Sequence, residues 1–436
     1  MKNKLKNAAI IVFIIAAIAL VILWGFILPK SAEKTEEDHP QTTIELVFPY
    51  QNSQWTNCIE EIIISFEESH PDIDIKYEIL YEDTVYEDIL SKKTARNELG
   101  DIVQLKEPYA WAETGLIAPL PSRFGESVDF VCSVDDEIYA VCALGSTTGI
   151  VYNKAIFDSL GLTPPSTYKD FLKICSVLRS KGITPLGVGG KDLWHLEYWL
   201  NHFLRADVLS VEPDFLALCS SGERDWNDEL ISSMLEHMSE LFTLGYVDPQ
   251  WANTTDSSLA YKMSEGEVAM VFSGPWLASS ALALESSMDL GWYYVPNDLG
   301  TTVAGESLDV FWAMTAQCAA DSAKKEAAIA FLDHFYSEGA YENLCTEMGS
   351  FSTLSNPNRS ATPDEGILAE VMEDNAKADI HISDYVGDEN TPPGFEKKLL
   401  LLLYDMCTGK ITTEETQNLA CLYWDECLAR EAAYEK

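Results

Sequence analysis

Strand-like and helix-like patterns of hydrophobic residues alternate along the first part of the chain. Residues 43–50 (TIELVFPY) predict a strand that Pro49 ends, and residues 55–68 carry apolar residues at helical spacing. Residues 73–79 alternate between apolar and polar positions as a strand does, residues 84–97 predict a helix, and residues 101–105 predict a short buried strand. Strands that alternate with helices in the order β-α-β-α-β predict an α/β sheet.

The middle and the end of the chain are predicted to be mainly helical. The pattern returns to a strand over residues 268–272, and a helix follows over 323–337. The last ~70 residues are largely helical by the same pattern. The helices predicted in the middle cover residues 168–181, 194–209, 228–244 and 257–265.

The N-terminus carries a long uncharged segment. Lys2, Lys4 and Lys6 precede residues 8–28, and a helix of that length would rise about 31 Å, enough to cross a bilayer. A secretory signal peptide has a shorter apolar core, about 7–15 residues, and a small-residue cleavage site that residues 28–32 (LPKSA) do not provide. We therefore expect an uncleaved signal anchor over 1–30 and a polar tether over 31–42. A cleaved signal peptide is the alternative.

The positive charges before the anchor predict its orientation. Lysines that flank a membrane span stay on the cytoplasmic side. The remainder of the chain is thus expected at the extracellular face of the cell membrane.

Composition and charge narrow the classes of function. Of 436 residues, 47% are hydrophobic and 23% charged, which is typical of a globular protein with two or three domains. Lys and Arg number 29 against 70 Asp and Glu, so the net charge is −41. A surface this acidic repels phosphate backbones, and we expect no nucleic-acid partner.

The cysteines and the short motifs suggest neither redox nor metal chemistry. Ten cysteines are present, without any CxxC pair, and most are expected to be free, buried residues. The chain has no GxxxxGK[ST], GxGxxG, HExxH or GxSxG motif. His195 and His202 lie seven residues apart on one predicted helix face, a spacing more typical of packing or of solvent exposure than of metal binding. We predict no cofactor, no metal site and no catalytic residue.

Several segments, in this order and spacing, are similar to those of the family 1 extracellular solute-binding proteins, which include the maltose-binding type. The similarity extends over roughly residues 43–350 and is weaker in the C-terminal quarter. Many Gram-positive members carry a lipobox cysteine, and this chain has none before Cys58. The segments are FEESHPDIDI (66–75), GDIV (100–103), GLIAPL (115–120), IYAV (138–141), VYNKAIF (151–157), GLTPP (161–165), YKDFL (168–172), GEVAMVFSGPW (266–276), FWAM (311–314) and KEAAIAFL (325–332).

The resemblance implies an α/β, two-lobe fold of the periplasmic-binding-protein type (type II), with a ligand cleft between the lobes. Lobe one would comprise residues 43–148 and 303–353, and lobe two residues 151–300 and 356–436. Ligand would bind in the cleft and be trapped by hinge closure. The implied function is an extracytoplasmic receptor that captures a carbohydrate, expected to be an oligosaccharide, and delivers it to the permease subunits of an ABC importer.

Two other classes of function stay open. A secreted glycoside hydrolase would need two carboxylates on opposite sides of the scissile bond, which 70 acidic residues supply by chance alone. The β-α start does not continue into eight βα units, which disfavours a barrel enzyme. A sensor ectodomain that reports a ligand without transport is the third possibility.

Aromatic side chains are the first candidates for a sugar site, because sugars present apolar C–H faces that stack on aromatic rings. By resemblance, Trp276 after the Gly274-Pro275 turn stacks on the sugar, and Trp312 matches a family position. Trp55 lies in the first strand-to-helix turn, and Trp194 lies near a helix start that Asp192 is predicted to cap. For Trp55, Trp276 and Trp312, packing in the core is the alternative.

Polar side chains are the second candidates, since they bind the hydroxyl rim of a sugar. Each is also compatible with an ordinary surface or packing role. The candidates are Gln54, Gln104, Glu107, Thr147, Thr148, Glu306 and Asp309.

Overall fold

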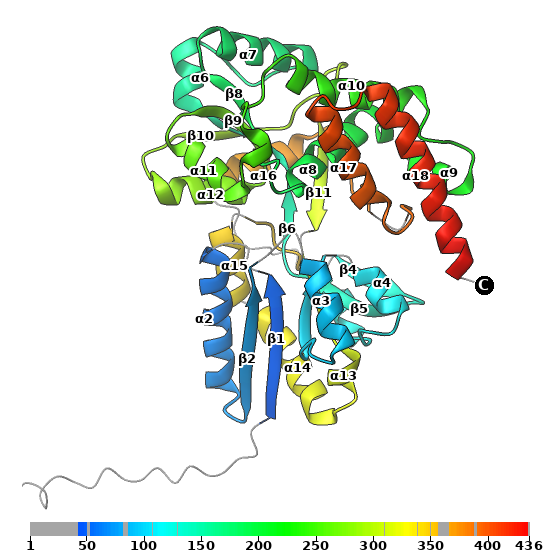
Figure 1. Cartoon of the computed structure of the whole chain (residues 1–436). Coiled ribbons are helices and arrows are strands. Elements are labelled where there is room, and N and C mark those ends of the chain that lie inside the picture. Colours follow the sequence, from blue (N-terminus) through cyan, green and yellow to red (C-terminus); the bar gives the residue numbers. More distant parts are fainter. Residues whose placement is uncertain are drawn as a thin grey trace, which may run out of the picture. The chain divides into compact units, whose positions relative to one another are not determined.

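A six-stranded mixed sheet contains the strands predicted near the N-terminus (Figure 1). The computed structural model describes residues 42–434 except 50–52, 82–85, 107, 129, 309, 338, 349, 356–365 and 388–389. The strand order is β2-β1-β3-β12-β5-β4, in which β1 pairs in parallel with β2 and β3, and β12 pairs antiparallel with β3 and β5. The strands are β1 (Thr42–Pro49), β2 (Ile73–Leu80), β3 (Ile102–Leu105), β4 (Val131–Val134), β5 (Glu137–Cys142) and β12 (Phe311–Met314).

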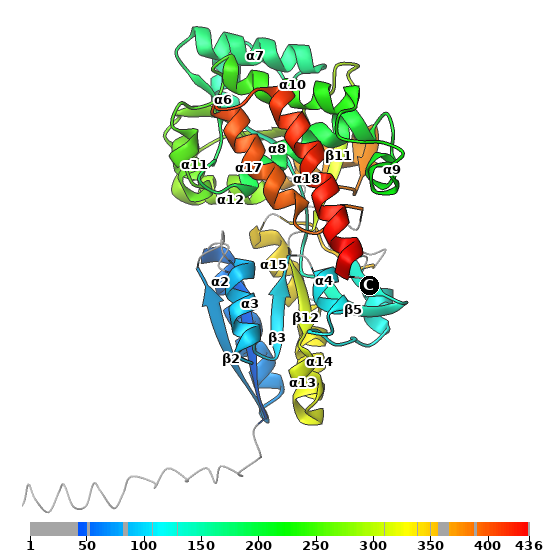
Figure 2. The ribbon, with the colours of Figure 1, turned by 45° about the vertical axis from the view of Figure 1, so that its right-hand side comes forward.

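Helices cover both faces of this sheet because successive strand residues point to opposite sides. Leu46 and Ile102 pack in a core with helices α2, α5, α13, α14 and α15, whereas Val47 and Val103 pack with α3 and α4 (Figure 2). We call this sheet and its helices the six-stranded-sheet region. The helices are α2 (Ser53–Ser69), α3 (Tyr86–Ala95), α4 (Pro108–Glu113), α5 (Arg123–Ser127), α13 (Ala316–Ala319), α14 (Ser322–Phe335) and α15 (Ala340–Met348).

A glycine-aspartate pair fixes the start of β3. Gly100 has φ +85°, and a Cβ there would lie 3.0 Å from the Glu45 carbonyl oxygen, so a side chain would be strained. The buried Asp101 carboxylate accepts a hydrogen bond from the Glu45 amide at 2.9 Å and an ion pair from Lys324 at 2.8 Å. These contacts tie β3 to β1 and to α14, which sets the position of the residues that follow.

A second sheet has four strands, in the order β10-β7-β9-β8. Strand β7 pairs antiparallel with β10 and β9, and β8 pairs in parallel with β9. Its two faces contribute to two different core clusters: Ile150 and Met270 lie in one, and Val151 and Val271 in the other. The strands are β7 (Gly149–Asn153), β8 (Thr184–Gly187), β9 (Val268–Ser273) and β10 (Leu290–Tyr293).

Helices from the middle and the end of the chain bury this second sheet. Together they form what we call the four-stranded-sheet region. Helices α11, α12 and α16 pack in the cluster that contains Val151. The remaining α-helices of this region pack in the cluster that contains Ile150. The helices are α6 (Lys154–Leu160), α7 (Tyr168–Ser180), α8 (Trp194–Phe203), the π-helix η2 (Leu204–Leu209), α9 (Phe215–Ser221), α10 (Glu229–Thr243), the 3₁₀-helix η3 (Trp251–Asn253), α11 (Asp256–Ser264), α12 (Pro275–Leu284), α16 (Ile367–Lys377), α17 (Phe395–Cys407) and α18 (Thr413–Tyr434).

A small third sheet joins three segments that are far apart in the sequence. It has the order β13-β11-β6, with β6 (Gly145–Thr147), β11 (Val303–Leu308) and β13 (Ile380–Ile382). Strand β6 directly follows the six-stranded sheet in the chain and precedes β7 of the four-stranded sheet. Strand β11 precedes β12, which inserts between β3 and β5, so the chain returns to the six-stranded sheet there.

The predicted order β-α-β-α-β at the start of the sheet is confirmed, with boundaries shifted by a few residues. The helix predicted over residues 194–209 differs in its second half, where α8 gives way to the π-helix η2. The buried Arg205 in η2 donates to the carbonyls of Asp384 at 3.0 Å and Ser383 at 3.2 Å. A wider helical turn that serves one side chain is common for π-helices, and hydrophobic periodicity does not predict it.

All ten cysteines lie in the described part of the chain, and none forms a disulfide. Eight are buried, as predicted from the sequence. Burial raises the pKa of the Cys132 thiol to about 11 and that of Cys345 to about 12, so these side chains stay protonated at neutral pH. They therefore act as small apolar residues.

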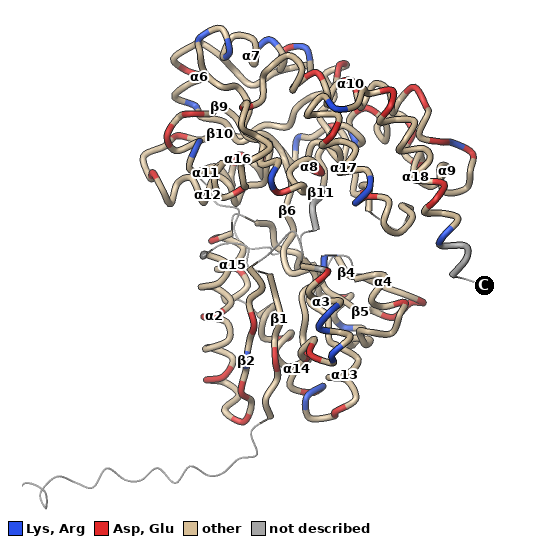
Figure 3. Tube along the Cα trace, viewed as in Figure 1, with Lys and Arg blue, Asp and Glu red and all other residues tan. Residues whose placement is uncertain are grey.

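Charged side chains are spread over both sheet regions. Figure 3 shows Asp and Glu on helices and loops of each, interspersed with fewer Lys and Arg. No helix within the described ranges of residues 42–434 combines the length and the hydropathy needed to span a bilayer. The predicted anchor at 1–30 and nearly all of the tether at 31–42 lie outside the described residues.

Candidate functional site

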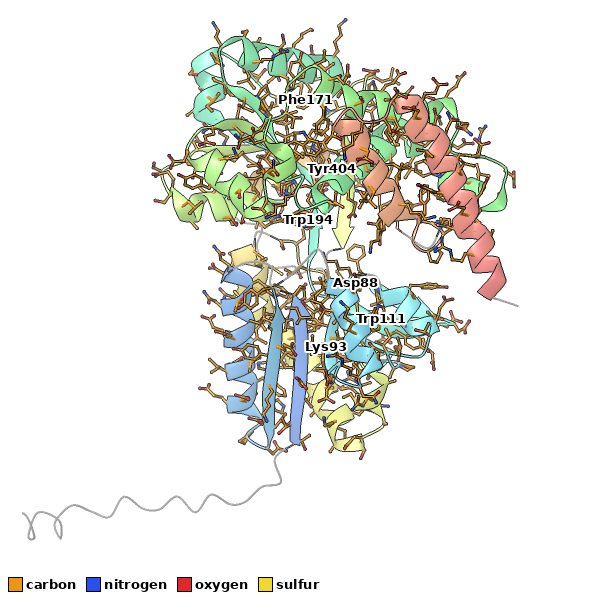
Figure 4. The ribbon with its side chains drawn as sticks, in the orientation of Figure 1. Asp88, Lys93, Trp111, Phe171, Trp194 and Tyr404 are labelled. Carbon is orange, nitrogen blue, oxygen red and sulfur yellow. The ribbon has the colours of Figure 1, made fainter. Side chains whose placement is uncertain are left out.

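Three aromatic rings lie next to one another in space, two from the first half of α8 and one from the start of α12. The ring centroids of Trp194 and Tyr198 are 5.3 Å apart, and those of Tyr198 and Trp276 are 5.9 Å apart. All three side chains are partly exposed. We call Trp194, Tyr198 and Trp276 the aromatic row, and Figure 4 labels Trp194 at its α8 end.

Exposure distinguishes the two tryptophans of the row from the others. Ten tryptophans lie in the described part of the chain, and eight of them are buried. Trp194 and Trp276 are the two tryptophans that are only partly buried. They lie in the first turns of two helices, α8 and α12, that are far apart in the sequence. Large apolar rings are usually buried, so two partly exposed rings that share a neighbour make this surface the candidate site.

A glycine-proline turn places Trp276. Strand β9 ends at Ser273, Gly274 continues in an extended conformation (φ −94°, ψ 175°), and Pro275 begins α12. A Cβ at Gly274 would lie 1.8 Å from the Trp276 ring. Only glycine therefore lets the ring fold against the backbone in this position.

The N-terminus of α8 is held by the segment before α11. The amide of Gly190 donates to the Trp251 carbonyl at 2.9 Å. The prediction that Asp192 caps α8 is wrong, because the cap residue is Leu193 and makes no side-chain cap. The Asp192 carboxylate instead accepts from the amide of Asp256 at 2.9 Å, at the beginning of α11.

Trp55 and Trp312 lie elsewhere. Both are fully buried in the core between the six-stranded sheet and α2 and α14, which is the packing role that the sequence left open. The ring of Trp312 contacts Phe48 edge-on at 6.1 Å and Phe335 at 5.6 Å. These rings are part of a close-packed core.

Gln104 is an unusual residue of the same core. It lies in β3 directly opposite Trp312 in the sheet register and is fully buried. Among the described residues, neither the oxygen nor the nitrogen of its side-chain amide has a hydrogen-bond partner, and the indole nitrogen of Trp312 has none either. Buried polar groups are normally paired, so an amide left unpaired at the end of a strand needs an explanation.

The threonine candidates lie at the third sheet. Both Thr147 and Thr148 are buried. The hydroxyl of Thr147 donates to the Gly305 carbonyl at 2.7 Å and lies 2.8 Å from the hydroxyl of Tyr294, which donates to Asn375 at 2.9 Å. The Thr147 hydroxyl thus joins β6, β11 and α16.

The other polar candidates are only partly described. Gln54 is half-buried in the first turn of α2. Glu306 lies in β11, where its register partner is Thr147. Glu107 and Asp309 lie outside the described residues.

The structure thus brings some candidates together and separates others. Trp194 and Trp276 meet through Tyr198, and Gln104 pairs with Trp312 across two strands. Among the described residues, no group of three or more His, Cys, Asp or Glu is arranged to hold a metal ion.

Sequence reasoning missed Tyr198 as a site residue. It lies four residues after Trp194, a spacing that puts both rings on one helix face, and this signal could have identified it.

Helix α8 also carries a buried histidine. Burial, followed by the charges of Arg205 and His237, lowers the pKa of His202 to about 3. The side chain is therefore neutral in the folded protein across the physiological range, in line with packing, one of the two roles predicted for it.

Comparison with known protein families gives a match over most of the chain. Residues 41–342 match the family of bacterial extracellular solute-binding proteins. An uncharacterised ABC transporter extracellular-binding protein of Pyrococcus horikoshii is 23% identical over 326 residues, which is 71% of this chain and 74% of that protein.

A second relative has a named ligand class. The multiple sugar-binding protein of Streptococcus mutans is 20% identical over 286 residues, which is 61% of this chain and 64% of that protein. The match therefore spans just under two thirds of that relative.

Solved structures share the fold. A chitin oligosaccharide binding protein aligns with a TM-score of 0.79 at 22% identity, over 89% of this chain and 99% of that one. The solute-binding protein RafE in complex with raffinose aligns with a TM-score of 0.73 at 20% identity, over 89% of this chain and 100% of that one. The mixed α/β fold of this chain is thus the one found in sugar-binding proteins.

Proposed function

This chain belongs to the bacterial extracellular solute-binding proteins, and we propose that it captures a carbohydrate, most simply an oligosaccharide, and delivers it to an ABC importer. The aromatic row carries the proposal. A sugar has apolar C–H faces, and rings that are partly exposed and close together offer matching surfaces. A row of three rings suits a ligand longer than one sugar unit, in keeping with the raffinose and chitin oligosaccharide in the names of structures with the same fold.

We propose that the two sheet regions are the two lobes of a binding protein, at 43–148 plus 303–353 and 151–300 plus 356–436. Separate cores around separate sheets support this division. The third sheet, built from β6, β11 and β13, would then be the hinge. The ligand cleft would lie between the lobes, and binding would close it.

Within the proposed cleft, the aromatic row supplies the stacking surface. The polar candidates would bind hydroxyl groups, and among them Gln104 has a fully buried amide whose two donors and acceptor lack partners among the described residues. Trp55 and Trp312 would back the site as packing residues, given that both are fully buried. The remaining polar members of the proposed set are Gln54, Glu107, Thr147, Thr148, Glu306 and Asp309.

The proposed partners are the permease subunits of an ABC importer. Relatives whose names include ABC transporter binding protein and multiple sugar-binding protein support this partner class. A family of extracellular proteins also supports a location outside the cytoplasm.

We further propose that residues 1–30 anchor the protein in the membrane, on the strength of the 21-residue uncharged segment and its poor cleavage site. Full-length protein should then fractionate with membranes and resist extraction by salt or carbonate. Recovery of a soluble form that begins near residue 32 would contradict the anchor and leave the binding function intact.

The binding function can be tested with a panel of mono- and oligosaccharides. Ligand that binds only the native state raises the melting temperature by mass action. A receptor should show a shift with at least one sugar, and mass spectrometry after prolonged incubation should recover that sugar unchanged. A panel without any shift would contradict carbohydrate binding, and catalytic hydrolysis of the bound sugar would indicate a glycoside hydrolase instead.

A further inference from the structure

A histidine lies directly behind the aromatic row. The imidazole ring of His195 is 4.5 Å from the ring of Trp194, tilted by 32°, and 5.6 Å from the ring of Tyr198, at 60°. His195 is therefore in contact with both members of the row that α8 contributes. It is itself fully buried, so it does not form part of the exposed surface.

A single hydrogen bond fixes the imidazole. Nε2 of His195 is 2.8 Å from a carboxylate oxygen of Asp256, whereas Nδ1 is buried and has no partner in the part of the chain that the structure describes. The neutral imidazole gains a hydrogen bond only when Nε2 carries the proton, and this determines its tautomer. The ring edge also faces a glycine: a Cβ at Gly189 would lie 2.8 Å from Cδ2 of His195.

Asp256 is in turn fixed by the chain around α8. Its amide donates to the Asp192 carboxylate at 2.9 Å, and the amide of Lys191 donates to the Thr254 carbonyl at 3.1 Å. Asp192, Asp256 and His195 thus form a connected set of hydrogen bonds that runs from the loop before α8, through the start of α11, to the back of the row.

Exposed aromatic rings lose rotational freedom when a ligand stacks on them, and this weakens binding unless the rings are already held in the bound orientation. We propose that His195, hydrogen-bonded to Asp256, is a positioning residue that holds Trp194 and Tyr198 in the orientation required for sugar binding. The proposal rests on the proposed function. It assigns the histidine no contact with the ligand.

The test is a double-mutant cycle read by isothermal titration calorimetry with the sugar that gives the largest melting shift. His195→Leu should weaken affinity about 3- to 10-fold, within the range of coupling between side chains in contact. His195→Gln, whose amide can still donate to Asp256, should recover most of that loss. In a Trp194→Ala background, His195→Leu should have a smaller effect, because only Tyr198 is then left for the histidine to hold.

A second histidine-aspartate pair in the same region provides a matched control. Nδ1 of His237 is 2.9 Å from Asp207, and its ring contacts Tyr168 and Phe203 instead of the row. His237→Leu should lower the melting temperature and leave sugar affinity unchanged. Should His195→Leu fail to fold, Asp256→Asn removes the charge of the partner at the same volume and takes its place in the cycle.

Two results would overturn the inference alone. One is wild-type affinity in both His195→Leu and Asp256→Asn, and the other is an unchanged effect of His195→Leu after Trp194 is removed. Absence of sugar binding by the wild-type protein would instead overturn the proposed function and this inference with it.

Discussion

The two tryptophan candidates in the six-stranded-sheet region and the two in the four-stranded-sheet region have different environments. Trp55 and Trp312 are fully buried among apolar residues, whereas Trp194 and Trp276 are partly exposed and share a contact with Tyr198. The six-stranded-sheet region also contains Gln104, a fully buried side-chain amide without a hydrogen-bond partner among the described residues. The tryptophan candidates of one region therefore pack in a core, and those of the other region keep part of their rings accessible.

The largest effect of this difference should be on stability. Trp312→Ala removes a fully buried ring and should lower the free energy of unfolding by about 3–5 kcal/mol. Urea denaturation of purified protein measures it. Trp312→Phe, which keeps a ring, should lose less. A loss below about 1 kcal/mol for the alanine variant would contradict the core assignment.

A smaller change in the free energy of unfolding, of opposite sign, is expected when Gln104 is replaced. Gln104→Met keeps the volume and removes two buried polar atoms without partners, so the free energy of unfolding should rise by about 1–3 kcal/mol. Affinity for the sugar should fall if the amide binds a hydroxyl group.

Gln417 is the matched control for this change. Its side chain donates to the Asp228 carbonyl at 2.9 Å and accepts from Ser232 at 3.0 Å. Gln417→Met should therefore destabilise the protein. A loss of stability in Gln104→Met as well would show that the Gln104 amide is paired in solution.

His202, one of the buried histidines of α8, should make the free energy of unfolding depend on pH. The pKa of His202 is about 3 in the folded protein, below its ordinary value of 6.5, so the unfolded state binds more protons between these values. Stability is fully present above pH 6.5 and should fall on acidification by up to about 1.4 kcal/mol per pH unit.

Urea unfolding at pH 7, 6, 5 and 4 compares the wild type with His202→Gln. The difference between the two should shrink as the pH falls. Parallel curves for His202→Gln would contradict burial of a neutral imidazole.

The smallest effect isolates the position of one ring. Gly274→Ala leaves Trp276 in the sequence but puts a Cβ where its ring lies, and an off-rotamer side chain costs about 0.5–1.5 kcal/mol. Sugar affinity should fall by a similar amount in titration calorimetry. The same change in a Trp276→Ala background should have no effect, and a persistent loss there would indicate a cause other than the ring.

The sequence predicted the elements whose periodicity is local. The strands and helices from β1 to β3 were expected almost at their observed bounds, because apolar spacing decides which face of an element is buried. The π-helix η2 could not be predicted in this way, because Arg205 donates to carbonyl groups at residues 383 and 384, nearly 180 positions away.

The site was predicted less well than the fold for the same reason. Trp276 and Trp312 both follow or occupy buried strands, and only neighbours brought together by folding decide which ring is exposed. Tyr198 was overlooked although its spacing from Trp194 is a local signal. His195 could not be assigned a partner, because Asp256 lies 61 residues further along the chain.

Binding calorimetry and thermal melting of Trp276→Ala, with the sugar selected by the panel, test the central claim most directly. Loss of a stacking ring should weaken binding by roughly 2–4 kcal/mol, as loss of an aromatic anchor does. The melting temperature should change far less than in Trp312→Ala. A large fall in melting temperature with unchanged affinity would show that Trp276 is a core residue and would contradict the aromatic row as the sugar-binding surface.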